Sequence, residues 1–147
     1  MAQVPPVTPG RICLSLVALS TSISCYIADW NDTHVKNPNW PPHARFHNGQ
    51  TMSMGLSLGL LTAYFTWRPV RDIRVAKDSI TTAALVGTLY WATGVSAILY
   101  PGTKWVDPEF GEGAPQRGVF LAHAALVWIG RWLELRRLDA AGKTKSG

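Results

Sequence analysis

Four long stretches without Asp, Glu, Lys or Arg limit what this chain can fold into. They cover residues 12–28, 46–67, 79–101 and 118–130. A bilayer core about 30 Å thick is crossed by about 20 apolar helical residues, with about 17 as the lower limit. The second and third stretches exceed this length, and the first is marginal. The fourth reaches it by extending past Arg131 to Leu135, because an arginine near a helix end can reach the interface. The sequence therefore predicts four membrane-spanning helices.

Composition alone allows either one ordinary globular domain or a small membrane protein, since 47% of the 147 residues are hydrophobic and 16% are charged. The clustering of the charges favours the membrane protein. We expect an all-α integral membrane four-helix bundle that forms a single four-span domain over residues 11–135, with disordered tails at 1–10 and 136–147. The expected helices cover residues 11–28, 42–67, 79–100 and 118–135.

The basic residues predict how the bundle is oriented. Ten of the 14 lie before the first helix, between the second and third, or at the end of the fourth. The positive-inside rule then places both termini in the cytoplasm. The tryptophans fall where an aromatic belt would place them, with Trp30, Trp40 and Trp105 at the outer ends and Trp67 and Trp132 at the inner ends. The net charge of +5 thereby has a topological explanation, and no nucleic-acid surface is expected. In a eukaryote we expect the endoplasmic reticulum membrane.

The first apolar segment also has a competing interpretation. Its single arginine, short apolar core and small residues near Ser22 and Ser24 resemble a cleaved signal peptide. Its two cysteines, Cys13 and Cys25, are 12 residues apart, which corresponds to about 18 Å along a helix, so they cannot pair with each other.

Three of the four histidines lie in residues 29–50, between the first two helices. Prolines in this stretch prevent a continuous helix until Pro42, which suits a first helical turn. His43 and His47 then share one face of helix 2, since they are four residues apart. Helical rise places His47 at the outer boundary and His123 about 10 Å below it. If helices 2 and 4 are neighbours, these three histidines point into one cavity.

An ionisable group inside a membrane indicates a functional site, and histidine can donate or accept a proton near neutral pH. The first hypothesis is therefore an enzyme that isomerises or cyclises a lipophilic small molecule, such as a terpenoid or a sterol-like compound. His47 or His123 acts as acid or base, His43 lies beside them, and Asp29 or Glu109 orients one of them. The remaining residues expected at the cavity are His34, Trp40, Asn48, Gln50, Tyr90 and Trp91.

Three alternatives remain open. The histidines can simply bond helices together. His43 and His47 also resemble half of a metal or haem site, although no H-E-x-x-H motif or cysteine ligand pair accompanies them, so no cofactor is expected. Finally, the protein can be a non-catalytic scaffold or lipid-binding protein. Gly55 and Gly59 form a G-x-x-x-G pair that lets a helix approach closely, either inside the bundle or in a homo-oligomer.

The stretch reads DWNDTHVKNPNWPPHARFHNGQ and resembles the signature of an uncharacterised family of small four-span membrane proteins from fungi and bacteria. In architecture the chain is also similar to the sterol isomerase and sigma-2 receptor group and to fungal membrane terpene cyclases. Those groups use acidic residues within their spans, whereas this chain is expected to have no Asp or Glu in a span interior. The resemblance therefore implies a lipophilic cavity and no carboxylate roles.

Overall fold

The computed structural model describes residues 5–144, so residues 1–4 and 145–147 of the two predicted tails lie outside the described part. This part is entirely helical, without strands, as the sequence predicts. Its four long helices are α1 (Pro9–Asp29), α2 (Pro42–Trp67), α3 (Ile73–Ser96) and α4 (Pro115–Thr144). Two short 3-10 turns, η1 (Ala97–Leu99) and η2 (Pro108–Phe110), lie between α3 and α4.

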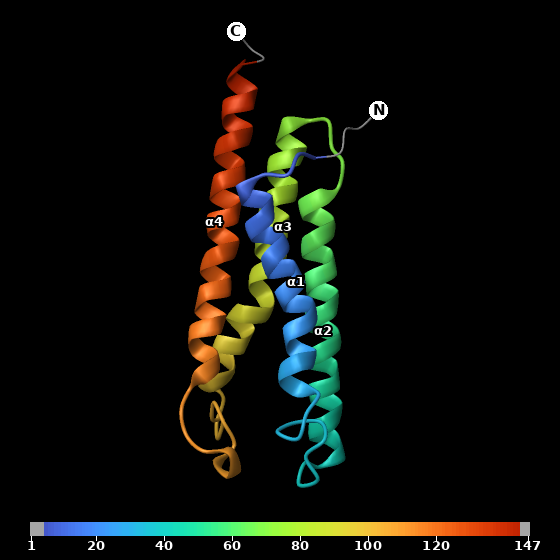
Figure 1. Ribbon diagram of the computed structural model, residues 1–147, viewed down its shortest axis with the longest axis vertical. Coiled ribbons are helices and arrows are strands. Elements are labelled where there is room, and N and C mark those ends of the chain that lie inside the picture. The colour runs from blue at the N-terminus through green and yellow to red at the C-terminus, as the bar shows by residue number, and fades with distance from the viewer. Residues whose placement is uncertain (1–4, 145–147) are drawn as a thin grey trace.

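Consecutive helices run in opposite directions (Figure 1). The start of α1, the α2–α3 connection and the end of α4 therefore gather at one end of the bundle. The connections over residues 30–41 and 97–114 gather at the other, which we call the loop end. Around the bundle each helix packs on the next, and α4 packs on α1. Within the described residues α2 and α4 make no close backbone contact, so the hypothesis that helices 2 and 4 are neighbours is wrong.

Local signals in the sequence set the helix starts. Thr8 caps α1 by accepting a hydrogen bond from the Arg11 amide at 3.2 Å, and prolines open α1, α2 and α4. At the start of α3 the Asp72 carboxylate accepts a hydrogen bond from the Arg74 amide at 2.7 Å. This bond holds the pKa of Asp72 below its usual range, because it favours the charged carboxylate.

Two helices extend by more than one turn beyond an expected boundary. α3 begins at Ile73 instead of residue 79, and α4 continues through residues 136–144, which were expected to be a disordered tail. Leu138 is buried against the core cluster that includes Ala76, and Lys77 pairs with Asp139. The charged ends of α3 and α4 therefore support each other beyond the apolar runs.

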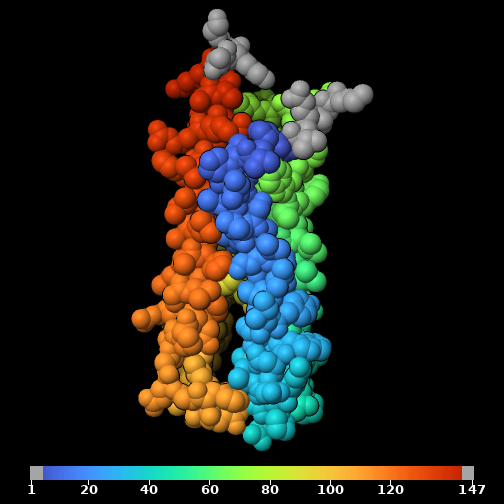
Figure 2. All heavy atoms as spheres, viewed as in Figure 1, coloured from blue at the N-terminus to red at the C-terminus, as the bar shows by residue number. Residues whose placement is uncertain are grey.

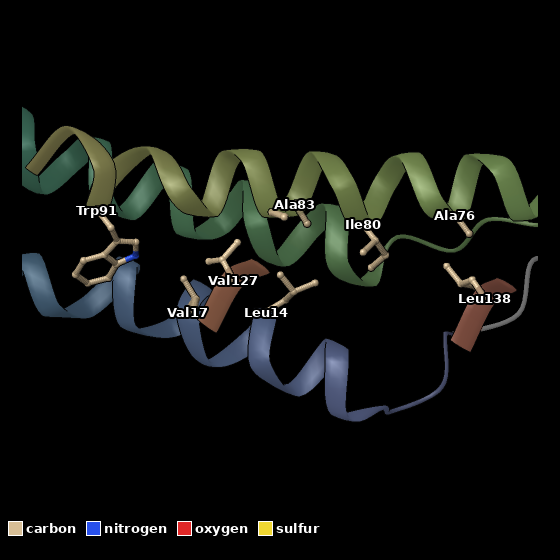
Figure 3. Packing of buried hydrophobic residues seen from close by; sticks show 9 residues of the cluster. Leu14, Val17, Ala76, Ile80, Ala83, Trp91, Val127 and Leu138 are labelled. Atoms are coloured by element: carbon tan, nitrogen blue, oxygen red, sulfur yellow. The ribbon is translucent and has the colours of Figure 1, made fainter. Parts of the chain in front are cut away.

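The interior of the bundle combines large apolar side chains with many small residues. The core cluster contains Leu14, Val17, Ala76, Ile80, Ala83, Ala84, Trp91, Val127 and Leu138, and Figure 3 labels most of them. Gly55 and Gly59 lie against α1, where a Cβ on Gly59 would come within 2.6 Å of the Ala18 carbonyl oxygen. The G-x-x-x-G pair is thus used inside the bundle. Many large apolar side chains point outward instead.

Three helices are long and apolar enough to cross a membrane: Pro9–Asp29, Ile73–Leu99 and Pro115–Lys143. α2 has a comparable length of 26 residues but is not among them. Its Gly, Ser and Thr residues lower its mean hydropathy, although its outward face carries Met54, Leu56, Leu60 and Leu61.

Candidate ligand cavity

A cavity of about 890 Å³ lies between the helices at the loop end. All four helices and residues 103–105 contribute to its wall. Figure 2 shows a gap between α1 and α4 in the half of the bundle nearer the loop end. Ligand pockets in proteins have volumes of about 300–1,000 Å³, so this space suits a drug-sized molecule.

Aromatic side chains form the deep wall of the cavity. Trp91 is fully buried, and its ring centroid lies 5.2 Å from that of Tyr90 and 5.7 Å from that of Phe120. The Trp91 indole donates a hydrogen bond to Thr21 Oγ1 at 3.0 Å, which fixes its position. Trp105 packs beside Phe120, with 6.4 Å between the ring centroids. These rings offer flat apolar surface to a lipophilic ligand.

Asp29 and His34 place ionisable groups on the same cavity. Asp29 ends α1, and His34 Nε2 lies 3.8 Å from Asp29 Oδ1. Asn31 Oδ1 accepts the amide hydrogen of Thr33 at 2.9 Å, and this tight turn brings His34 back beside Asp29. Thr33 Oγ1 contacts the other imidazole nitrogen, Nδ1, at 2.7 Å. The imidazole is therefore held at Nδ1, whereas Nε2 lies near the Asp29 carboxylate but beyond hydrogen-bond distance of it.

Asn48 holds Asp29 from α2, where its amide donates a hydrogen bond to Asp29 Oδ2 at 3.0 Å. Trp40 contacts His34 edge-on, with ring centroids 5.2 Å apart. Of the six residues expected to line the cavity, His34, Gln50, Tyr90 and Trp91 do so, whereas Trp40 and Asn48 support the Asp29–His34 pair.

The other histidines lie elsewhere. His43 and His47 are exposed at the start of α2, where their Nε2 atoms are 3.0 Å apart, and they do not line the cavity. His123 stacks on Trp91 from α4, with 4.0 Å between the ring centroids, and bonds to Ser20 on α1 at 2.8 Å. The expectation that His43, His47 and His123 meet in one cavity is therefore wrong, because α2 and α4 are diagonal in the bundle.

Glu109 connects the two loops at the mouth of the cavity. Its carboxylate accepts hydrogen bonds from Asn37 at 2.6 Å and from Asn39 at 3.2 Å. Glu109 does not line the cavity, and its carboxylate orients the 30–41 loop and not a histidine. Asp107 adds a longer contact, 3.3 Å, to the Trp40 indole. The connections that follow α1 and α3 are thereby linked across the mouth.

The opposite end of the bundle is closed by buried charges. Glu134 has no exposed surface and bonds to Arg11 Nε at 2.9 Å, to Thr8 Oγ1 at 2.5 Å and to Arg137 at 2.8 Å. Arg11 also donates to the carbonyl oxygen of Thr66. Glu134 is level with the start of α1 and the end of α2, where Arg11 pairs with it, so it does not lie in the interior of an expected span.

Several residues at the cavity and around Glu134 carried no local signal in the sequence. Lys104 and Trp105 line the cavity because the α3–α4 connection folds back over the loop end, and Phe120 lines it from the first turns of α4. Glu134 and Arg11 are more than 120 residues apart, yet the sequence does place both on the basic side of the bundle. Within residues 5–144 no group of three His, Cys, Asp or Glu side chains is arranged to hold a metal ion.

The chain belongs to DUF6640, a family of unknown function, whose profile matches residues 13–145. The match covers the stretch at 29–50 and nearly all of the four helices. No curated protein and no solved structure matches the chain.

Proposed function

We propose that this protein crosses a membrane four times, takes a lipophilic molecule into the cavity and transfers a proton on it with Asp29 and His34. The observation that carries the proposal is the position of this carboxylate–imidazole pair on an aromatic cavity of about 890 Å³. Isomerisation or cyclisation of a terpenoid or sterol-like substrate is the reaction class that needs such groups.

Surface composition supports the membrane location. Soluble proteins seldom expose large contiguous apolar areas, yet all four helices here expose large apolar side chains. Exposed examples are Leu16, Leu19, Leu60, Leu61, Leu85, Leu89, Leu121 and Ile129. Small residues inside and large apolar residues outside are typical of helices that pack within lipid. The outward face of α2 suits it to be the fourth span, and the positive-inside rule favours cytoplasmic termini.

The chemistry follows from the two side chains. The Asp29 carboxylate is well placed to orient His34 and to stabilise its imidazolium form. The imidazole removes a proton from the bound substrate and returns it at another atom, which moves a double bond or closes a ring. The aromatic wall excludes water and offers π faces to positive charge that develops on the substrate. His34 thus takes the role that the sequence suggested for His47 or His123.

Mass spectrometry of small molecules that co-purify with the detergent-extracted protein tests binding. We expect a defined lipophilic compound in the wild-type protein, because the cavity is large and mostly apolar. Ala97→Trp fills the cavity from its wall and should remove the compound. If no compound is found, or if Ala97→Trp retains it unchanged, the cavity is not the binding site.

Conversion of the identified compound tests catalysis. His34→Ala should retain the compound and lower turnover by about 100-fold or more, the usual contribution of a general acid or base. His43→Ala is the matched control, because His43 is exposed and lies outside the cavity. Equal turnover in both variants would rule out the role of His34. A wild-type protein that binds but never converts the compound would be a lipid-binding protein, which is the second candidate function.

A further inference from the structure

A serine and a histidine meet on the seam between α1 and α4, apart from the Asp29–His34 pair. Ser20 Oγ lies 2.8 Å from His123 Nε2. Both side chains are partly exposed, and neither lines the cavity. We propose that Ser20 is a nucleophile and His123 its general base, and that they transfer the acyl group of a lipid ester that approaches this seam.

The hydrogen bonds of His123 fix which nitrogen faces the serine. His123 Nδ1 lies 2.8 Å from the carbonyl oxygen of Val119, which can only accept a hydrogen bond. The proton of the neutral ring is therefore on Nδ1, and the lone pair of Nε2 points to Ser20. A hydroxyl, a base and a third group that orients the base are the arrangement that activates a serine.

Stacking restrains the imidazole further. The His123 ring lies against Trp91, with 4.0 Å between centroids and 20° between planes. Trp91 is itself fully buried and bonded to Thr21, the residue after Ser20. The base is thus held by a wall that α1 and α3 position, and α1 supplies the nucleophile.

Several other helical hydroxyls bond within their own helix. Ser22, Ser57 and Thr88 each donate to the carbonyl oxygen four residues earlier, at 2.9, 2.9 and 2.7 Å. This local bond satisfies a hydroxyl within an apolar helix. Ser20 instead contacts a basic nitrogen on another helix, so its proton has an acceptor that can carry it.

The surroundings of the pair indicate the substrate class. Leu16, Leu19 and Ile23 are exposed on α1 around Ser20. An exposed apolar helix face next to a nucleophile favours an acyl chain over a polar substrate. An ester carbonyl carried by such a chain reaches Ser20 from the side of the bundle. The proposal uses neither Asp29 nor His34 and goes beyond the proton transfer proposed above.

The acyl transfer runs in two balanced steps. Ser20 Oγ attacks the ester carbonyl carbon while its proton moves to His123 Nε2. The C–O bond to the alcohol breaks, and His123 returns the proton to the leaving oxygen, which gives acyl-Ser20 and a free alcohol. A water molecule or a second alcohol then attacks the acyl carbon by the same proton path and restores Ser20.

A long-chain alkyl fluorophosphonate tests the nucleophile, because Ser20 Oγ would attack phosphorus, displace fluoride and remain phosphonylated. In the full-length protein in detergent micelles, peptide mass spectrometry should find the adduct on Ser20. Ser20→Ala should show none. Ser57→Ala is the matched control and should keep the adduct on Ser20. Ser57 is also an exposed helical serine, but it donates its hydrogen bond to the Ser53 carbonyl oxygen. Absence of a Ser20 adduct in the folded wild-type protein would overturn the proposal.

Replacement of the base separates catalysis from packing. His123→Phe keeps a ring against Trp91 but has no nitrogen, and His123→Gln keeps a hydrogen-bonding group that is not a base. Both should slow labelling of Ser20 by about 100-fold or more. His47→Phe should label at the wild-type rate. A Ser20 adduct that forms at the wild-type rate in either His123 variant would mean that the contact only joins α1 to α4.

Discussion

The Glu134 carboxylate accepts hydrogen bonds from three side chains: Arg11 on α1, Arg137 on α4, and Thr8, which precedes α1. Its side chain has no exposed surface, and that of Arg11 is 5% exposed. Removal of one member of a buried ion pair leaves the other charged and unpaired, at a cost of about 3–5 kcal/mol. We expect Glu134→Ala to lower the midpoint of thermal unfolding in detergent micelles sharply.

Asp139→Ala is the matched control for Glu134→Ala, on the same helix. Asp139 pairs with Lys77, but its side chain is 56% exposed. Exposed pairs contribute at most about 1 kcal/mol, so its midpoint should change little. Similar midpoints for the two variants would show that the buried charges at this end do not stabilise the bundle.

Histidines show how far residue identity locates a site. The sequence directs attention to residues 29–50, because polar groups beside apolar runs are costly unless they are used or paired, and Asp29, His34 and Gln50 of this stretch line the cavity. The choice among the histidines depends on side-chain direction. His34 turns back to Asp29 because Asn31 closes a tight turn, whereas His43 and His47 follow the helix outward. No spacing rule distinguishes these outcomes before the loop conformation is known.

Among the elements, the α1–α2 pair depends most on glycine. A Cβ on Gly59 would lie 2.6 Å from the Ala18 carbonyl oxygen and 2.9 Å from the Ser22 amide nitrogen, and neither can move without α1. Gly59→Ala should therefore separate the two helices and destabilise the protein by about 1–3 kcal/mol, the usual cost of overpacking. The readout is again the unfolding midpoint.

Gly49→Ala tests the same substitution on the same helix without the contact. No heavy atom lies within 4 Å of a Cβ built at Gly49. Alanine is a better helix former than glycine by up to about 1 kcal/mol, so the midpoint should rise or stay unchanged. If both glycine variants raise the midpoint, helix propensity and not close packing would determine the effect of Gly59→Ala.

Helix boundaries were predictable where prolines or apolar runs mark them. α2 covers residues 42–67, as the sequence predicts, because Pro42 suits the first turn and the apolar run ends at Trp67. The ends of α3 and α4 were not predictable from hydropathy. Charged residues there were interpreted as loop and tail, but Leu138 and the Lys77–Asp139 pair extend both helices together.

At the scale of the whole molecule, two helical hairpins are joined tightly at one end and are separated by the cavity at the other. The buried charges around Glu134 close the tight end, and Glu109 links the two loops at the loop end. For the proposed ligand we expect two routes, between the linked loops or through the gap between α1 and α4 that Figure 2 shows. The second route opens toward lipid if the bundle lies in a membrane, which suits a lipophilic ligand.

The position of α2 decides whether the bundle spans the membrane four times. Single cysteines can report on which side of the membrane each connection lies, in a variant whose Cys13 and Cys25 are replaced by alanine. The exposed positions Asp32, Arg71 and Glu112 lie before α2, after α2 and before α4, respectively. We expect a membrane-impermeant maleimide to label Asp32→Cys and Glu112→Cys in intact cells or correctly oriented vesicles. Arg71→Cys should react only after permeabilisation, because the positive-inside rule predicts that the basic connection is cytoplasmic.

Each contrary pattern in this labelling has a separate meaning. If Asp32→Cys and Arg71→Cys react on the same side, α2 does not cross, and its apolar outward face must be covered by something other than lipid. If Asp32→Cys and Glu112→Cys react on opposite sides, the two linked loops cannot face one compartment, and the bundle is not inserted as a unit. Reaction of Arg71→Cys alone in intact vesicles would reverse the orientation while keeping four spans, because the positions at the two ends would simply exchange compartments.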